Sequence, residues 1–383
     1  MKHLGIITFH KSWNYGSVLQ AWALQDILQR NGYHVDIIDY EPQHLNEMYT
    51  IFRNNNSISS LIFNAKRVPV APLISIRKKS FYRFRGEKLS LSVKKYKYNS
   101  DITSLDNEYD CIICGSDQIW NVMIKDCDPA FFLPDVKNVR KIAYAVSMGN
   151  SDFATLNELE QQKYKNWIMD YDYISVREEK TEDKINRLLE NEKTYFCAVD
   201  PTLLHRKEDY DLIASKRIVS GEYIFLYNIW NPEDGFEMAK TVSEMLELPV
   251  YTIMTWNNLR MFVTITKNGI KTKVFKTAPE HFLSLIRNAT FVMTDSFHGT
   301  AFSIIFEKPF VCINYRVNNN LKNDIRIYNI LNIFGLENRY ISKKMIDCLN
   351  LSEPLDYETI TRNRMQIADK SIHWLLNAIE SNL

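Results

Sequence analysis

The sequence FVMTDSFHGT occupies residues 291–300 and combines an apolar strand, a polar turn and the start of a helix. An apolar helical pattern precedes it, and another follows as far as Lys308-Pro309, where a further strand begins. This order predicts an α-β-α-β unit. The first turn of a helix presents unpaired N–H groups and a partial positive charge, which stabilise an anion. His298 would then lie beside a bound anion, although Asp295 and Ser296 equally suit a simple helix cap.

The first half of the chain repeats this alternation of strand and helix. Apolar strands are expected near residues 4–9, 35–40, 109–114, 142–147 and 173–176. Such alternation is typical of a parallel sheet with helices on both faces, and ligands bind such sheets at the carboxyl ends of the strands. The polar turns that should meet at this edge are residues 10–17, 115–118, 147–149 and 177–179.

A change of pattern between residues 198 and 217 predicts a domain boundary. A second alternating series starts near Tyr223 and includes the histidine turn, so we expect two Rossmann-like domains. The predicted domains are residues 1–205, with a basic insertion around 48–100, and residues 206–350. An amphipathic helix within residues 351–383 is expected to close the fold.

The chain has 383 residues, is 45% hydrophobic and carries a formal net charge of +1, which argues against a nucleic-acid partner. Its charge is nevertheless uneven, because residues 48–86, the basic segment, contain no Asp or Glu. Apolar residues are interleaved with its cations, so it suits anionic lipid head groups, a lid over an anionic ligand, or a helix pair with an exposed basic face. The cations are Arg53, Lys66, Arg67, Arg77, Lys78, Lys79, Arg83 and Arg85.

The chain shows neither a run of apolar residues long enough to span a membrane nor a signal-peptide layout at its start. We therefore expect a cytoplasmic protein, with room for peripheral contact with the inner membrane face. Six cysteines fit a reducing compartment. Cys111 and Cys114 have metal-like spacing, but alternation along their strand sends them to opposite faces, so no metal site is predicted there.

Six short segments in register resemble the polysaccharide pyruvyl transferase family, and the resemblance covers roughly residues 3–335. It implies an α/β protein of two Rossmann-like domains facing a cleft, similar to GT-B glycosyltransferases. The segments are Gly5-Ile-Ile-Thr-Phe with Asn14-Tyr-Gly-Ser-Val-Leu-Gln, Gly115-Ser-Asp-Gln-Ile-Trp-Asn, Ala143-Tyr-Ala-Val-Ser-Met-Gly, Ile174-Ser-Val-Arg-Glu, Val199-Asp-Pro-Thr and Asp295-Ser-Phe-His-Gly.

The resemblance implies phosphoenolpyruvate as donor and a sugar unit of a surface polysaccharide, or its lipid-linked precursor, as acceptor. Pyruvate would be placed as a ketal on two sugar hydroxyls, with no further cofactor. The family's histidine falls on His298 and its arginine on Arg177. Many relatives have Arg-Leu-His where this chain has Ser296-Phe297-His298, so Lys322 and Arg326 are candidates for the charge that Ser296 lacks.

Roles follow from this chemistry. Protonation of the donor's methylene group needs a general acid such as His298, and closure of the ketal needs a carboxylate base such as Asp117 or Asp295. Arg177 offers a bidentate fork for the anionic donor. The expected catalytic residues are His298, Arg177, Asp295 and Asp117. The expected donor-binding residues are Arg177, Ser296, His298, Gly299, Thr300, Lys322 and Arg326. The expected acceptor-binding residues are Asn14, Tyr15, Gly16, Ser116, Asp117 and Gln118.

Simpler interpretations exist for several of these residues. Arg177 with its neighbouring glutamates suits a surface charge cluster, Asp117 suits a helix cap, and Asn14 and Gly16 suit a tight turn. The scattered histidines predict no metal site. Two other functions fit the same plan, namely a nucleotide-sugar glycosyltransferase and a binding subunit of a polysaccharide assembly complex.

Overall fold

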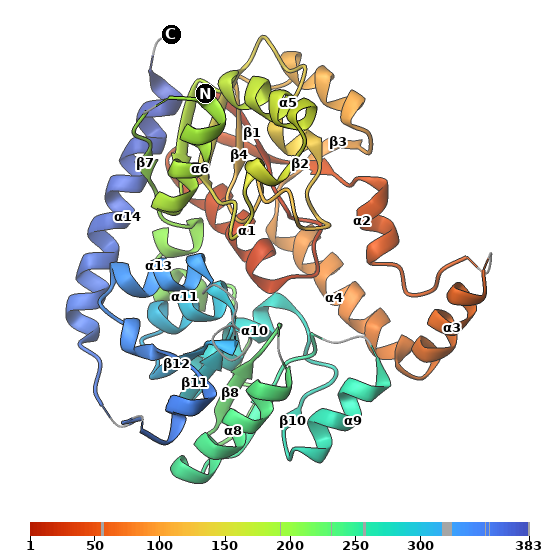
Figure 1. Ribbon diagram of the computed structural model, residues 1–383, viewed down its shortest axis with the longest axis vertical. Coiled ribbons are helices and arrows are strands. Elements are labelled where there is room, and N and C mark those ends of the chain that lie inside the picture. The colour runs from red at the N-terminus through yellow and green to blue at the C-terminus, as the bar shows by residue number, and fades with distance from the viewer. Residues whose placement is uncertain are drawn as a thin grey trace. The chain divides into compact units, whose positions relative to one another are not determined.

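The computed structural model describes residues 1–383 except 55–56, 192, 231, 256–257, 316–323, 349, 352 and 382–383. The chain forms two compact units (Figure 1). The first consists of Met1–Met48, Arg85–His205 and Arg364–Leu383. The second consists of Tyr49–Phe84 and Arg206–Asn363.

The first unit contains a parallel sheet of seven described strands in the order β3-β2-β1-β4-β5-β6-β7. The order reverses direction between β1 and β4, and such a switch point is where open α/β sheets bind ligands. The expected strands are present, and β3 and β7 are additional. Their bounds are β1 His3–Ile7, β2 His34–Tyr40, β3 Leu91–Tyr96, β4 Cys111–Gly115, β5 Arg140–Val146, β6 Tyr173–Val176 and β7 Phe196–Cys197.

Helices connect most of these strands, and α1 begins at a residue that caps it. The side chain of Asn14 accepts a hydrogen bond from the N–H of Gly16 at the start of α1, as expected for an N-cap residue. Arg140 and Arg364 tie the last helix to the first unit, through the carbonyls of Ile379 and Leu203 respectively. The helices are α1 Tyr15–Arg30, α2 Gln43–Met48, α5 Glu158–Met169, α6 Glu179–Leu189 and α14 Tyr357–Glu380. A further helix, α4 Ala71–Lys88, belongs to the first unit only from Arg85 onward.

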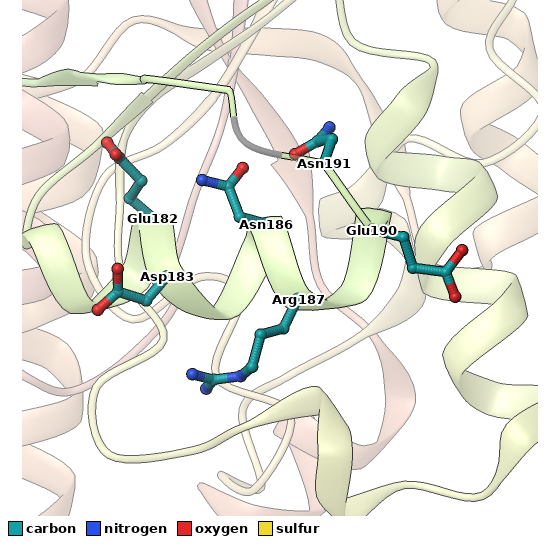
Figure 2. Close-up of a pocket in the computed structure, with 6 residues that line it drawn as sticks. All are labelled: Glu182, Asp183, Asn186, Arg187, Glu190 and Asn191. Atoms are coloured by element: carbon teal, nitrogen blue, oxygen red, sulfur yellow. The ribbon is translucent and has the colours of Figure 1, made fainter.

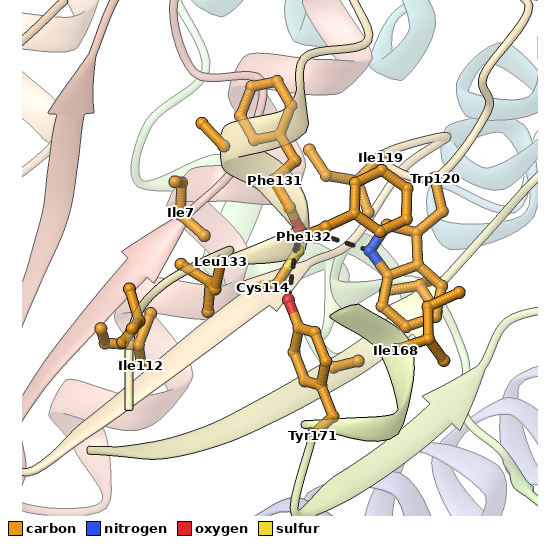
Figure 3. Close-up of a cluster of buried hydrophobic side chains, with 14 of the residues drawn as sticks. Ile7, Ile112, Cys114, Ile119, Trp120, Phe131, Phe132, Leu133, Ile168 and Tyr171 are labelled. Atoms are coloured by element: carbon orange, nitrogen blue, oxygen red, sulfur yellow. Dashed lines mark hydrogen bonds between the residues drawn. The ribbon is translucent and has the colours of Figure 1, made fainter. Parts of the chain in front are cut away.

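The core of the first unit lies beside β4, and Figure 3 shows part of it. The carbonyl oxygen of Phe131 accepts hydrogen bonds from the Cys114 thiol, the Trp120 indole and the Tyr171 hydroxyl. Burial raises the pKa of the Cys114 thiol to about 12, so the thiol stays protonated and behaves as an apolar group. Cys111 and Cys114 are free and buried.

The second unit contains a parallel sheet of six described strands in the order β10-β9-β8-β11-β12-β13. Its switch point lies between β8 and β11, so the histidine turn predicted from the sequence follows a central strand. The strands are β8 Ile224–Tyr227, β9 Val250–Thr252, β10 Lys271–Thr272, β11 Phe291–Thr294, β12 Phe310–Ile313 and β13 Tyr340–Ile341. The helices are α3 Ile58–Arg67, α7 Lys207–Asp211, α8 Pro232–Leu246, α9 Leu259–Lys267, α10 Pro279–Arg287, α11 Phe297–Ile305 and α13 Ile325–Ile333.

Most of the basic segment belongs to the second unit, whereas the sequence pattern had placed it within the first domain. Arg77 donates to the carbonyl of Thr255 at 3.0 Å, and Arg83 forms an ion pair with Glu280. These contacts join residues that are far apart in the sequence, which is why order along the chain misassigned the segment. Among the described residues, none of the helices is both long and apolar enough to cross a membrane.

Candidate functional site

The loops after β1, β4 and β6 converge in the first unit, as predicted from their polar residues. Ser17 donates to the carboxylate of Asp117 at 2.7 Å, although 100 residues separate them in the sequence. The nearest oxygen of Asp117 lies 4.0 Å from a guanidinium nitrogen of Arg177. The structure therefore brings together two of the predicted catalytic residues, both buried, at the carboxyl end of the sheet.

Arg177 is surrounded by carboxylates of its own unit. Its Nε donates to Glu178 at 2.9 Å and one terminal nitrogen donates to Asp200 at 2.8 Å. Burial by itself would lower the pKa of Arg177, but Glu178, Asp200 and Asp117 outweigh it and raise that pKa. One guanidinium facing three carboxylates makes a negative cluster, which disfavours an anionic donor. This geometry gives Arg177 a positioning role instead of the predicted donor contact.

Asp117 depends on an unusual backbone turn at the end of β4. The peptide bond between Gly115 and Ser116 is cis, and Asp117 has a φ of 68°. A Cβ atom at Gly115, whose φ is +125°, would lie 2.3 Å from the carbonyl oxygen of Tyr144. Only glycine fits this position, and the turn directs the Asp117 carboxylate towards Ser17 and Arg177.

The other predicted acceptor residues divide into internal and accessible ones. Tyr15 is fully buried, and Ser116 donates to the carbonyl of Ala145 at 2.6 Å. Asn14 caps α1 through Gly16, so these two residues start a helix where the simpler interpretation had a tight turn. Asn14 and Gln118 are half-buried, so they are the predicted acceptor residues with side chains within reach of a ligand.

A second polar cluster near this edge was missed in the sequence analysis. His10 contacts Asp39 at 3.2 Å and is completely buried, while Lys11 forms an ion pair with the same carboxylate. Burial lowers the pKa of His10, and its hydrogen bond to Asp39 opposes this only in part. The signal was available, because both His10 and Asp39 lie at the carboxyl ends of adjacent strands, β1 and β2.

In the second unit, hydroxyl groups hold the turn between β11 and α11. Thr294 donates to the carbonyl of Tyr227 at 2.7 Å and accepts the N–H of Ser296 at 3.1 Å. The hydroxyl of Ser296 accepts the N–H of Gly299, and Thr300 donates back to the carbonyl of Ser296. These hydrogen bonds confine the start of α11 to one geometry.

Close packing at this turn requires Gly299. A Cβ atom there would lie 2.2 Å from the hydroxyl oxygen of Thr294. His298, in the first turn of α11, is 5% exposed and packs edge-on against Phe297 with ring centroids 5.1 Å apart. The sequence prediction therefore placed His298 correctly at a helix start that follows a central strand.

Asp295 has a clear structural role. Its two carboxylate oxygens accept the N–H groups of Ile229 and Trp230 at 2.7 and 2.8 Å. The carboxylate thus holds the loop after β8 against the loop after β11. Because both oxygens are engaged by the backbone, Asp295 is better suited to positioning than to the predicted role of base.

The two cations predicted after β12 to contact the donor are Lys322 and Arg326. Lys322 lies outside the described residues. Arg326 makes a two-pronged contact with Asp324, with Nε at 3.0 Å and a terminal nitrogen at 2.6 Å. Asp324 also caps α13 through the N–H of Arg326. The ion pair neutralises the guanidinium charge that the prediction assigned to the donor.

A group able to hold a metal ion lies at the opposite edge of the first sheet. His3, His34 and Asp36 have potential ligand atoms within 4.8 Å of one another. His3 and His34 are in register on adjacent strands, and His34 and Asp36 share one face of β2. Pairing of distant strands hid this cluster from the sequence analysis, and its place at the amino ends separates it from Asp117.

Two cavities lie away from the predicted residues. One, of about 650 Å³, is lined by Glu182, Asp183, Asn186, Arg187, Glu190 and Asn191, along α6 and the turn after it (Figure 2). The other, of about 430 Å³, is lined by Ile51, Ser75, Lys78, Lys79, Tyr82 and Arg83 of the basic segment. Neither lining includes a predicted catalytic, donor-binding or acceptor-binding residue.

Comparisons with known proteins agree with the predicted fold and family. A family model described as polysaccharide pyruvyl transferase matches residues 14–316. A UDP-GlcNAc 2-epimerase from Methanocaldococcus jannaschii has a TM-score of 0.57 at 12% identity, covering 98% of this chain and 99% of the other. MnaA from S. aureus, solved with UDP, has a TM-score of 0.53 at 11% identity, covering 99% and 96%.

These two solved structures have the GT-B fold, so the likeness confirms the predicted fold class. At such low identity it carries no information on substrate. A comparison with curated proteins finds no match.

Proposed function

The chain belongs to the polysaccharide pyruvyl transferase family, and from this premise we propose that it transfers pyruvate from phosphoenolpyruvate to two hydroxyls of one sugar. The acceptor would be a unit of a surface polysaccharide or its lipid-linked repeat unit, modified in the cytoplasm at the inner membrane face. The product would be a pyruvate ketal and the by-product inorganic phosphate.

The observation that carries the proposal is the turn at residues 294–300 of the second unit. It combines a histidine, three hydroxyl side chains and the N-terminus of α11 at the carboxyl end of a central strand. Helix N-terminal N–H groups stabilise phosphate and carboxylate, and both groups are present on the donor. We assign the donor to this turn, with contacts to Ser296 and His298, whereas Thr300 is fully buried and serves to hold the turn.

The proposed reaction assigns a proton to each step. His298 donates a proton to the methylene carbon of the donor, while the first sugar hydroxyl attacks the adjacent enol carbon and passes its proton to a carboxylate base. Phosphate then leaves and takes up this proton. The second hydroxyl attacks the resulting oxocarbenium-like centre and its proton returns to His298. General acid catalysis of this kind contributes roughly 10²–10⁴-fold in rate.

The first unit supports the acceptor side of the proposal. Its cluster has three carboxylates around one guanidinium, which suits neutral sugar hydroxyls better than an anion. We assign Asp117 to the acceptor hydroxyl as base and Arg177 to positioning Asp117. Asn14 and Gln118 would contact the sugar through their side-chain amides.

The proposal requires no metal ion in the reaction. His3, His34 and Asp36 could hold an ion, but none of them is among the residues assigned to the donor or the acceptor. Turnover that survives exhaustive chelation would support this view, and restoration of lost turnover by magnesium would contradict it.

The test separates donor binding from chemistry. Thermal stabilisation by phosphoenolpyruvate and by UDP is measured beside phosphate release in the presence of a lipid-linked saccharide fraction. A ligand at about 100 times its dissociation constant stabilises by roughly 2.7 kcal/mol. We expect stabilisation by phosphoenolpyruvate in the wild type and in His298→Gln, with phosphate release lost only in the variant.

The matched control is His281→Gln, another histidine of the second unit, which lies on α10 and caps it through Ala278. It should leave both measurements nearly unchanged at neutral pH. Stabilisation by UDP but not by phosphoenolpyruvate would refute the proposal and favour a nucleotide-sugar glycosyltransferase. Unchanged turnover in His298→Gln would favour a binding subunit.

A further inference from the structure

Helix α3 of the basic segment presents an apolar face to solvent. Ile58, Leu61 and Ile62 are 77%, 51% and 51% exposed. With exposed Ala65 they follow the spacing i, i+3, i+4, i+7, which places all four on one side of a helix. A globular protein normally turns such a face towards its core.

The opposite face of α3 is fixed to its own unit. Asn64 both accepts from the N–H and donates to the carbonyl of Arg53, each at 2.8 Å. The guanidinium groups of Arg53 and Arg67 lie 4.0 and 4.2 Å from the ring centre of Phe63, and Arg67 also donates to the carbonyl of Thr50. The contacts with Thr50 and Arg53 thus hold this face of α3 against the preceding segment and leave the apolar face outward.

The segment that carries this face is strongly positive. Residues 48–86 contain eight Lys and Arg residues and no acidic residue. Lys66 on α3 and Lys78 and Lys79 on α4 are exposed, and Val68, between the two helices, is 60% exposed. Lys78 and Lys79 also line the cavity of about 430 Å³.

We infer that the outward face of α3, with Lys66, Lys78 and Lys79, is a docking surface for an anionic lipid bilayer. Its apolar side chains enter the boundary between head groups and acyl chains while the lysines contact lipid phosphates. Charge decides against a second copy of the chain as occupant, because two such surfaces would repel each other. An apolar face kept exposed in a monomer also indicates an interaction site.

This inference goes beyond the proposed function and rests on the surface of the segment alone. Vesicle binding is measured without turnover, and stabilisation by phosphoenolpyruvate is recorded on the same preparations. Failure of vesicle binding with intact donor stabilisation would therefore overturn the docking surface and leave the proposed function standing.

The experiment is co-sedimentation of the full chain with phosphatidylcholine vesicles, with and without phosphatidylglycerol. We expect binding to the anionic vesicles only, weakened by salt. Ile58→Ser/Leu61→Ser/Ile62→Ser should abolish it. Each lysine near the surface contributes roughly fivefold in affinity, so Lys78→Ala/Lys79→Ala should weaken binding about 30-fold.

Matched controls separate this surface from general stickiness and charge. Met123→Ser/Leu159→Ser/Met169→Ser removes three apolar side chains that are 66%, 79% and 64% exposed in the first unit. Lys163→Ala/Lys180→Ala removes two exposed lysines there. The inference would be overturned by equal loss of binding in these controls or by equal binding to neutral vesicles. Dimerisation through α3 without vesicle binding would also overturn it.

Discussion

The two units share an architecture but differ in how they hold the carboxyl edge of their sheets. The first unit uses charge, with Arg177 among Glu178, Asp200 and Asp117, all of them buried. At the corresponding edge, the second unit uses hydroxyls and backbone N–H groups around α11, together with the Asp295 carboxylate, which accepts two backbone N–H groups. A parallel sheet therefore supplies the place for a site, while the loop residues decide whether an anion or a neutral hydroxyl is favoured there.

The largest effect is expected from breaking the charge cluster of the first unit. Arg177→Ala leaves Glu178 and Asp200 buried without their cation, which costs about 3–5 kcal/mol of unfolding free energy. Urea denaturation measures the change. The control is Arg187→Ala, which removes an exposed ion pair to Asp152 and should cost less than about 1 kcal/mol. Equal losses in the two variants would mean that the cluster is not essential to the fold.

Replacing glycine by alanine tests how tightly the backbone is packed in the turns after β4 and β11. Gly115→Ala meets the backbone carbonyl of Tyr144, whereas Gly299→Ala meets side-chain atoms of Thr294, namely its hydroxyl oxygen and its Cβ. Both should destabilise by roughly 1–3 kcal/mol, with Gly115→Ala the worse. Gly86→Ala on α4 has open space around it and should stabilise by roughly 0.5–1 kcal/mol. Thermal unfolding ranks the three, and a reversed order for the first two would contradict the comparison.

The hydrogen bonds from the loop after β8 to Asp295 can be tested by replacing this one carboxylate. Asp295→Asn keeps one acceptor oxygen and turns an amide towards the N–H of either Ile229 or Trp230. Leaving one partly buried donor unsatisfied should cost roughly 1–2 kcal/mol. Because Asp295 is assigned to positioning, residual turnover should remain measurable. Complete loss of turnover with unchanged stability would instead indicate a catalytic carboxylate.

The smallest effect concerns pH. Burial, followed by repulsion from Lys276 and Arg83, lowers the pKa of His281 to about 4. The unfolded chain takes up a proton near pH 6.5 and the folded chain only near pH 4, so stability is lost as the pH falls between these values. The loss should be about 1 kcal/mol, because solvent screens the half-buried ring. Urea midpoints across this range should fall less in His281→Gln, and an unchanged slope would exclude His281 as the cause.

Periodicity and turn residues in the sequence were sufficient for most of the fold. Apolar runs ending in polar residues located the central strands, because strand burial and loop chemistry are local properties. The pattern at residues 291–300 also identified His298 and its helix. Short edge strands such as β7 and β10 lack such runs and were missed.

Local sequence patterns could not predict which side chains contact one another across the sheet. Three sets of contacts changed the expected role of a residue. They are the carboxylates around Arg177, the backbone N–H groups bound by Asp295, and the ion pair between Asp324 and Arg326. Each depends on which loops meet after the strands are ordered. The basic segment is a further case, since contacts through Arg77 and Arg83 assign it to the second unit.

The sequence alone determined that this chain is a two-domain α/β protein with a histidine at a strand-to-helix turn, because hydrophobic period and helix capping act over a few residues. Only the tertiary structure decided which charges neutralise one another and that α3 turns its apolar face outward. Electrostatic pairing and burial depend on distances between segments far apart in the chain, and folding sets those distances.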